Sequence, residues 1–366
     1  MEEYLGDKGK TIPGRLATRT LELYRKGRAK LVSVRYGNPA STVRVIAVTG
    51  HYGKTTTGLL LLAILKEAGR TAIKYEHVAS DDAVSELQRE LKEAKGKGAE
   101  FFVVEVTPEL MASGALTGVS VDTVIAMSPS VEADELLKQN VSYVVIPDDY
   151  QAGKLAIADH QIITFGEQET AEARINKVAL YRKGTEVEMT IDHHTSLTVA
   201  THLVGSANAY NLAAAIASAY VLGIPFNTVE EGAASVEKVE GNYEYLKGER
   251  PYVVVTDSAE ANRSIELVVD STKELSKRRL LVALIAGTAS DSSIQHVKKM
   301  ANRLVLVSPE EMALPGIEVV GSAEEAWRIV SRAAKLDDTV LLMGKEFVSQ
   351  KELFSISSTS EEKESK

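Results

Sequence analysis

The stretch Val45–Leu65, which reads VIAVTGHYGKTTTGLLLLAIL, decides the fold of this chain. An apolar run ends at Thr49-Gly50. A short glycine-containing turn follows, then Lys54 with three threonines, and then an apolar segment with helical character. A strand, a turn and a helix in this order direct backbone N–H groups and the positive end of the helix dipole toward an anion. We therefore expect Lys54 to contact the β- and γ-phosphates of a nucleotide and the Thr55 hydroxyl to bind Mg²⁺.

This loop is shorter than the common phosphate-binding pattern G-x-x-x-x-G-K-[ST], because Val48 stands where that pattern has its first glycine. The loop reads G-x-x-G-K-T-T instead. We expect the nucleotide to be bound by Gly50, His51, Gly53, Lys54, Thr55 and Thr56. The alternative is a plain strand-to-helix turn with an exposed lysine. Within the loop, His51 either contacts phosphate or lies at the rim.

Apolar runs alternate with helix-like stretches over most of the chain. In the first half, the strand-like runs lie at residues 43–50, 70–78, 99–107, 121–128, 141–147 and 161–166. Continuous apolar strands separated by helices are typical of a parallel sheet with both faces covered. From 173 to 204, β-branched residues alternate with polar ones, with turn signals at Lys183-Gly184 and Asp192-His193. This pattern predicts a small antiparallel sheet.

A second alternating block of strands and helices runs from residue 250 to residue 344. We therefore predict an α/β fold with a central P-loop parallel-sheet domain, a small accessory antiparallel sheet, and a smaller C-terminal Rossmann-like α/β domain. The expected boundaries are a basic N-terminal helical segment at 1–43, the central ATP-binding domain at 44–248, the C-terminal domain at 249–354 and a disordered tail at 355–366.

Composition and charge limit the classes of partner. The chain has 366 residues and a formal net charge of −9, which argues against general nucleic-acid binding. Residues 1–44 contain ten Lys or Arg and four Asp or Glu. This segment is either a basic helix that contacts a membrane surface or a protein partner, or a solvated helix packed on the next domain. The chain has no cysteine, which excludes disulfides and is compatible with the cytoplasmic location that we expect.

Four stretches, taken in order, resemble motifs of the Mur ligase family, the ATP-dependent amide ligases of peptidoglycan precursor synthesis. The loop TGHYGKTT at 49–56 is similar to the family's T-G-T-x-G-K-[ST]-[ST], and GSANAYNLAAA at 205–215 is similar to G-x-x-N-x-x-N-x-x-A-A. GNYE at 241–244 stands where the family has G-R-x-E, and TDSAE at 256–260 stands where one branch has V-D-Y-A-H. The resemblance covers roughly residues 35–345 and extends to short Mur-like ligases that lack the usual N-terminal UDP-binding domain.

This resemblance implies a ligase reaction with ATP and Mg²⁺ as cofactors. ATP phosphorylates a substrate carboxylate, an amine attacks the acyl phosphate, and ADP and phosphate are released. The implied partners are a UDP-linked or other carboxylate substrate and an amino acid, in peptidoglycan precursor metabolism. The implied site residues are Lys54 and Glu105 in catalysis, Thr55 and Glu105 at Mg²⁺, Asn208 at the nucleotide base and Asp257 at the ribose.

Each of these implied roles has an ordinary structural alternative. Glu105 and Asp257 are otherwise acidic residues at strand ends, and Asn208 is otherwise a helix N-cap. The pair His193-His194 has no third metal ligand in view, which favours a turn in the small sheet over a metal site.

Several features of the family are missing from this chain. The Asp-His pair expected after residues 121–127 is absent, Asn242 replaces the arginine of G-R-x-E, Glu260 replaces the histidine of D-Y-A-H, and the D-N-P-R motif that reads diaminopimelate is absent. Lys138 is a poor match for the family's carbamylated lysine. Losing charges that act in a transition state lowers the rate strongly. Two hypotheses therefore stand: an active ATP-dependent ligase, or a catalytically degenerate paralogue that serves as a nucleotide-binding or structural partner of an active ligase complex.

Overall fold

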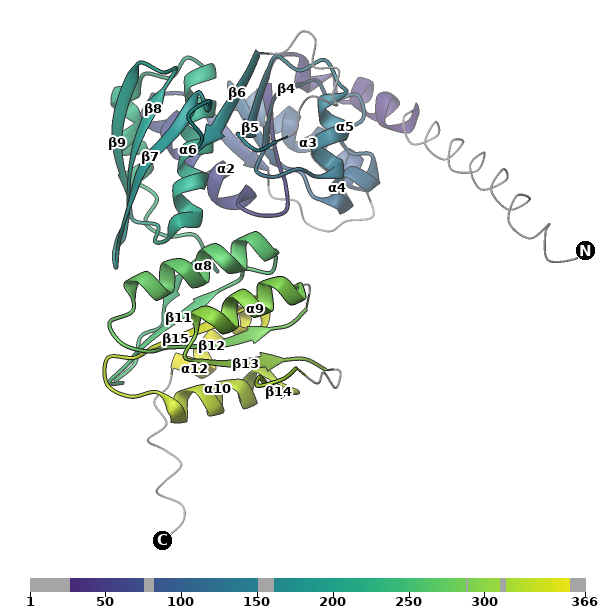
Figure 1. Ribbon diagram of the computed structural model, residues 1–366. Coiled ribbons are helices and arrows are strands. Elements are labelled where there is room, and N and C mark those ends of the chain that lie inside the picture. The colour runs from purple at the N-terminus through teal and green to yellow at the C-terminus, as the bar shows by residue number, and fades with distance from the viewer. Residues whose placement is uncertain (1–26, 76–81, 151–160, 288, 310–313, 356–366) are drawn as a thin grey trace, which may run out of the picture. The chain divides into compact units, whose positions relative to one another are not determined.

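The computed structural model describes residues 27–75, 82–150, 161–287, 289–309 and 314–355 (Figure 1). The chain divides into two compact units. Unit 1 comprises residues 1–164 and 214–228, and unit 2 comprises residues 165–213 and 229–366. Residues 1–26 of the predicted basic segment and 356–366 of the predicted tail lie outside the described residues, and the domain boundaries drawn from the sequence stay a prediction.

The sheet of unit 1 follows the strand order β2-β3-β1-β4-β5-β6. Its strands are β1 (Arg44–Thr49), β2 (Ala72–Tyr75), β3 (Phe101–Glu105), β4 (Val121–Ala126), β5 (Tyr143–Pro147) and β6 (Gln161–Gly166), the last of which ends in unit 2. β1 pairs in parallel with both β3 and β4, so that Ala47 lies between Val104 and Val124. The loop after β1 therefore leaves the middle of the sheet at its carboxyl edge, where ligands bind in open α/β sheets.

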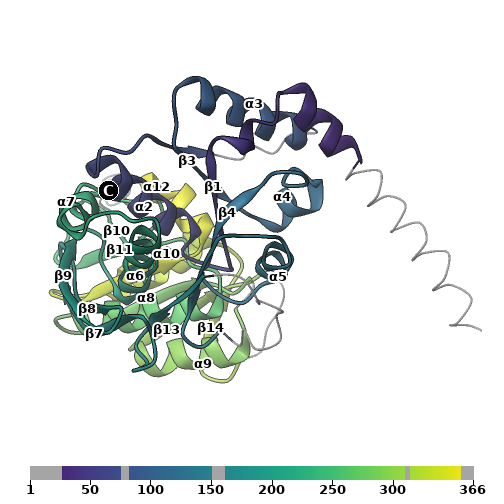
Figure 2. The ribbon, with the colours of Figure 1, turned by 90° about the horizontal axis from the view of Figure 1, so that it is seen from above.

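Helices cover both faces of this sheet. α3 (Ala83–Gly96), α4 (Pro108–Ser113) and α5 (Val131–Leu137) lie on one side of β1, β3 and β4, and α2 (Lys54–Glu67) lies on the other (Figure 2). Val45 and Ala47 of β1 share a buried core with Leu87 and Leu91 of α3. The four-residue spacing of these leucines places both on one face of the helix. The continuous apolar strands seen in the sequence are thus explained by burial on both faces.

Three antiparallel strands follow in unit 2. They are β7 (Ala173–Tyr181), β8 (Gly184–Ile191) and β9 (Thr195–Thr201). β7 extends the order of the first sheet, because Phe165 at the end of β6 pairs in parallel with Ala173. Asp192 and His193 both have positive φ and form the turn between β8 and β9, in which His194 also lies. The predicted antiparallel strands and the turn at Asp192-His193 are confirmed, but the strands continue the first sheet and do not form a separate small sheet.

Unit 2 also contains a second sheet, with the order β10-β11-β15-β12-β13-β14, in which β10 is antiparallel and the other described pairs are parallel. Its strands are β10 (Glu244–Tyr245), β11 (Val253–Asp257), β12 (Leu280–Ile285), β13 (Arg303–Val307), β14 (Glu318–Val320) and β15 (Thr339–Met343). Ile265 and Val297 pack on one face of this sheet, and Val330 and Phe347 pack on the other. The predicted α/β fold with a second, smaller sheet is confirmed.

The helices of the second sheet lie in two layers (Figure 1). They are α8 (Asn262–Leu275) and α9 (Asp291–Met300) on one face, and α10 (Ala323–Ala333), α11 (Lys345–Ser349) and α12 (Lys351–Ser355) on the other. The structure also describes η1 (Pro39–Ser41), α6 (Ser206–Val221), η3 (Phe226–Thr228) and α7 (Val229–Ala234). In the part of the chain that the structure describes, no helix combines the length and the apolar character that crossing a bilayer requires.

Candidate functional site

The loop between β1 and α2 needs glycine at two positions. Gly50 has a φ of +120°, and a Cβ atom there would lie 2.8 Å from the backbone nitrogen of Ser128. Gly53 has a φ of +73° and is the N-cap of α2. Residues with a Cβ atom rarely adopt these φ values. The glycine spacing noted in the sequence is therefore set by the shape of the loop itself.

The loop is also fixed from the neighbouring strand. The backbone N–H of His51 donates a hydrogen bond to Ser128 Oγ, with 2.9 Å between the two atoms. Ser128 follows β4, so two adjacent strand ends hold the loop in place. The first backbone N–H groups of a helix lack partners within the helix, and they point at the space in front of it. The beginning of α2 is therefore suited to an anion.

Lys54 lies over this loop. Its Nζ donates to the backbone oxygen of Gly50 at 2.7 Å, which places the ammonium group beside the turn rather than in open solvent. Thr56 is buried in the first turn of α2. The structure thus brings together in unit 1 all six loop residues that the sequence assigned to the nucleotide.

Thr55 and Glu105 form a pair of oxygen donors beside the loop. Thr55 Oγ1 donates to Glu105 Oε2 at 2.8 Å. Glu105 is the last residue of β3, next to β1 in the sheet. A hydroxyl and a carboxylate are the hard oxygen ligands that Mg²⁺ prefers, so these two residues fit the ion that the sequence predicted.

Lys74 is a member of this cluster that the sequence analysis missed. It lies on β2, and its Nζ is 2.8 Å from Glu105 Oε1. The side chains of Lys74 and Glu105 are only 10% and 18% exposed. A lysine in a strand with alternating polar and apolar residues does not by itself indicate a functional site. Only the pairing of β2 with β3 brings it to the carboxylate.

Asn208 lies in unit 2 and is buried in a network of amide groups. Its Nδ2 donates to Val204 O at 2.8 Å and to Asn242 Oδ1 at 3.1 Å. Its Oδ1 accepts from Asn211 Nδ2 at 3.0 Å and from Asn242 Nδ2 at 3.1 Å. α6 begins at Ser206, so Asn208 belongs to the first turn and is not the N-cap. Asn242, which stands at the arginine position of the family motif, is here a structural partner of Asn208.

Asp257 also lies in unit 2, at the end of β11. Its carboxylate accepts hydrogen bonds from the backbone N–H of Tyr243 at 2.8 Å and from that of Ala259 at 2.7 Å. Burial raises the pKa of Asp257 to about 6, although these two backbone hydrogen bonds act in the opposite direction. The carboxylate therefore holds the start of the Tyr243 segment against the end of β11.

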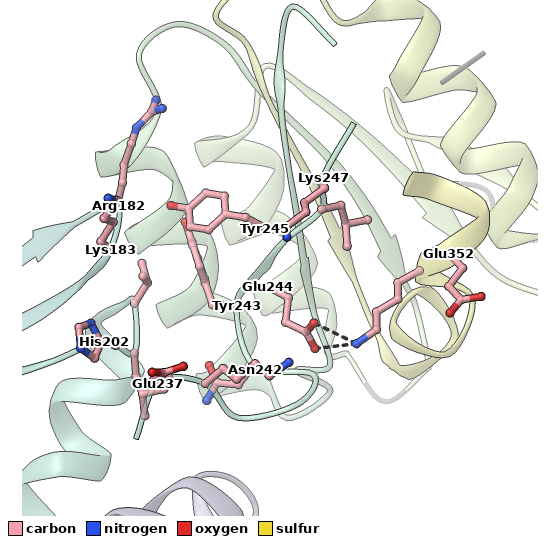
Figure 3. A pocket seen from close by; sticks show the side chains of 15 residues that line it. Arg182, Lys183, His202, Glu237, Asn242, Tyr243, Glu244, Tyr245, Lys247 and Glu352 are labelled. Carbon is pink, nitrogen blue, oxygen red and sulfur yellow. Dashed lines mark hydrogen bonds and ion pairs between the residues drawn. The ribbon is translucent and has the colours of Figure 1, made fainter. Parts of the chain in front are cut away.

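A pocket of about 690 Å³ lies beside these residues in unit 2 (Figure 3). Tyr243 and Tyr245 line it with their rings edge to face, 5.7 Å apart. The basic residues in its lining are Arg182, Lys183, Lys238, Lys247 and Lys351. Lys351 forms an ion pair with Glu244, with 2.9 Å between Nζ and Oε2. The lining also contains Glu237, Glu244 and Glu352, so basic side chains outnumber acidic ones by five to three. Aromatic faces and an excess of basic side chains suit a ligand that carries both a ring and negative charge.

Metal-binding clusters and the positions that differ from the family motifs were the remaining candidates for a site in the described part of the chain. Among the described residues, no group of three or more His, Asp or Glu side chains could hold a metal ion. Lys138 is exposed, and its Nζ pairs with Glu135 Oε1 at 2.5 Å. Glu260, at the histidine position of the family motif, pairs with Lys345 at 2.8 Å.

Comparisons with known proteins show which proteins this chain is similar to. A family model described as the Mur ligase middle domain matches residues 131–219. The UDP-N-acetylmuramoyl-L-alanyl-D-glutamate–2,6-diaminopimelate ligase of Halalkalibacterium halodurans is 24% identical over 377 residues, which cover 88% of this chain and 77% of that protein. The ligase of the same name from Geobacillus kaustophilus is 25% identical, with 74% of this chain and 62% of that protein covered.

Solved structures share the fold. The MurF ligase of Thermotoga maritima, solved in complex with ADP, matches with a TM-score of 0.72 at 18% identity, over 89% of this chain and 82% of that chain. A pseudomurein peptide ligase type C from Methanothermus fervidus matches with a TM-score of 0.64 at 19% identity, over 85% and 78% of the two chains. At these identities the match shows the fold alone.

Proposed function

We propose, from the premise that this chain is related to the Mur ligases, that it is an ATP-dependent ligase that joins a carboxylate to an amine. The observation that carries this proposal is the assembly of Lys54, Thr55 and Glu105 around the loop after β1. The relatives supply the reaction class, and their names supply the candidate substrates. The acceptor is then a UDP-linked muramoyl peptide or another carboxylate, and the donor of the amine is an amino acid.

In this proposal the loop holds the phosphates of ATP. The backbone N–H groups at the start of α2 bind phosphate oxygens, and Lys54 moves from the Gly50 carbonyl to the β- and γ-phosphates. Thr55 and Glu105 hold Mg²⁺, which neutralises phosphate charge when it is bound. The role of the protein is then to orient the γ-phosphate toward the carboxylate and to keep water out.

The proposed reaction has two steps. A carboxylate oxygen attacks the γ-phosphorus, the bond to ADP breaks, and an acyl phosphate forms. The amine nitrogen then attacks the acyl carbon, phosphate leaves, and the amine loses a proton as the amide forms. Contact of Asn208 with the base and of Asp257 with the ribose stays a prediction, because both side chains are engaged by protein groups in this structure.

A second candidate function rests on Asn242 and Glu260. These residues stand at the family's arginine and histidine positions, and they pair with Asn208 and Lys345. A chain that binds ATP without transferring its phosphate would then be a nucleotide-binding partner of an active ligase complex. A cytoplasmic location, and contact of residues 1–43 with a membrane surface or a protein, also stay predictions.

Calorimetric titration with ATP tests the shared part of both candidates. We expect binding with a Kd between about 1 μM and 1 mM that requires Mg²⁺ and is lost in Lys54→Ala. Lys66→Ala is the matched control, because Lys66 is exposed in the last turn of the same helix. No binding of ATP at millimolar concentration would contradict the proposal.

Phosphate release separates the two candidates. The assay supplies Mg·ATP, a UDP-muramoyl dipeptide and diaminopimelate, the compounds named for the relatives. Release that depends on both the carboxylate and the amine supports the ligase. ATP binding without release, across a panel of carboxylates and amines, favours the nucleotide-binding partner.

A further inference from the structure

Lys74 forms an ion pair with one of the two carboxylate oxygens of Glu105, the residue that is proposed to bind Mg²⁺. Glu105 Oε1 is 2.8 Å from Lys74 Nζ, and Glu105 Oε2 accepts from Thr55 Oγ1 at 2.8 Å. Each carboxylate oxygen therefore has a partner from the protein. The three residues come from β2, β3 and α2, and all belong to unit 1.

The position of Lys74 is fixed by its surroundings. Tyr75 pairs with Val104 and Lys74 with Val103 in the parallel ladder of β2 and β3. The stem of Lys74 passes α2 at Gly58, where an added Cβ atom would lie 3.9 Å from Lys74 Cε. With 10% of its side chain exposed, the ammonium group is largely withdrawn from solvent, and the Glu105 carboxylate compensates part of its charge.

This arrangement affects how a divalent cation can enter. A metal ion at Glu105 would lie within a few ångströms of the Lys74 ammonium, and like charges at that distance repel strongly in a partly buried site. The phosphates of ATP bring negative charge that offsets this repulsion. A divalent cation without nucleotide brings no negative charge to offset it.

We propose that Lys74 is a positioning residue that keeps Glu105 occupied until nucleotide arrives, so that Mg²⁺ binds together with ATP and not before it. The inference rests on the proposed function, because it takes Thr55 and Glu105 as the metal ligands. It assigns to Lys74 the role of an internal counter-ion that competes with the divalent cation for one carboxylate.

The test is calorimetric titration with Mn²⁺ in the absence of nucleotide. We expect Lys74→Met to bind Mn²⁺ at least about tenfold more tightly than the unmodified protein, because the like charge next to Glu105 is gone. Lys74→Arg keeps the cation and should restore weak binding. The double variant K74M/E105Q should lose the gain, which would show that the gain acts through Glu105.

Folding and nucleotide binding are checked in the same samples. Circular dichroism confirms that each variant is folded, and Lys74→Gln is used in place of K74M if that variant fails to fold. The role of Lys74 is overturned if a folded Lys74→Met or Lys74→Gln variant still binds ATP but binds Mn²⁺ no more tightly than the unmodified protein does. Failure of the unmodified protein to bind Mg·ATP would instead overturn the proposed function.

Discussion

Asn208 and Asn242 form a pair of amides at two positions where the sequence resembles the motifs of a ligase family. The two amides exchange hydrogen bonds in both directions, at 3.1 Å each. Asn208 is 1% exposed, so its carbonyl and amino groups are satisfied inside the protein. The residue at 242 therefore supports the start of α6 instead of supplying a fixed positive charge.

This pairing predicts a measurable coupling. Asn208→Ala should lower the free energy of unfolding by about 1–3 kcal/mol, because it leaves buried amide groups of its neighbours without a partner. In a double-mutant cycle with Asn242→Ala, we expect a coupling energy of about 0.5–3 kcal/mol, measured by urea unfolding. Additive effects of the two substitutions would show that the amides do not depend on each other.

Asp257 makes stability depend on pH. Its pKa is raised from 3.8 to about 6, first by burial and also by the nearby Glu244. Between these two values the folded protein binds more protons than the unfolded chain, so the free energy of unfolding falls as pH rises from about 4 to about 6. Across this range, the titration of this one carboxyl lowers the free energy of unfolding by on the order of 3 kcal/mol.

Comparison with Asp257→Asn isolates this effect. The variant lacks the titrating group, so the difference in the free energy of unfolding between the variant and the unmodified protein should change between pH 4 and pH 6 and level off above it. Urea unfolding at several pH values measures this difference. A difference that stays constant over that range would mean that the pKa of Asp257 is close to its ordinary value.

At the scale of an element, the antiparallel strands of unit 2 depend on close backbone contact at Gly184. This residue begins β8 with a φ of +156°, and an added Cβ atom would lie 2.1 Å from the backbone oxygen of Thr201 on β9. Neither strand can move aside without loss of the register that pairs Thr185 with Thr201.

Gly184→Ala should therefore lower the free energy of unfolding by about 2–4 kcal/mol. Gly96→Ala is the matched control, because Gly96 ends a helix, has no atom within 4 Å of the added Cβ, and should be neutral or stabilising by up to about 1 kcal/mol. Thermal unfolding followed by circular dichroism compares the two. Equal melting temperatures for both variants would argue against this packing.

At the scale of the whole molecule, the sequence predicts features that depend on local spacing. The turn between β1 and α2 follows from Gly50, Gly53 and Lys54, which lie within five residues of chain, and the antiparallel strands follow from alternation and turn residues. The Lys74–Glu105 pair is not predicted, because it needs the order of β2, β3 and β1 in the sheet. The Asn208–Asn242 pair likewise joins segments that only the folded chain brings together.

The division of the chain into two units also predicts how ATP should affect stability. The loop residues Lys54 and Thr55, with Glu105, all belong to unit 1. If Mg·ATP binds there as proposed, we expect it to stabilise the transition in which unit 1 unfolds. At a hundred times the Kd, the expected gain in the free energy of unfolding is about 2.7 kcal/mol. Differential scanning calorimetry with and without Mg·ATP measures it, and Lys54→Ala should abolish the shift while Lys66→Ala retains it. An equal shift in Lys54→Ala would mean that ATP stabilises the protein from a site other than the loop after β1.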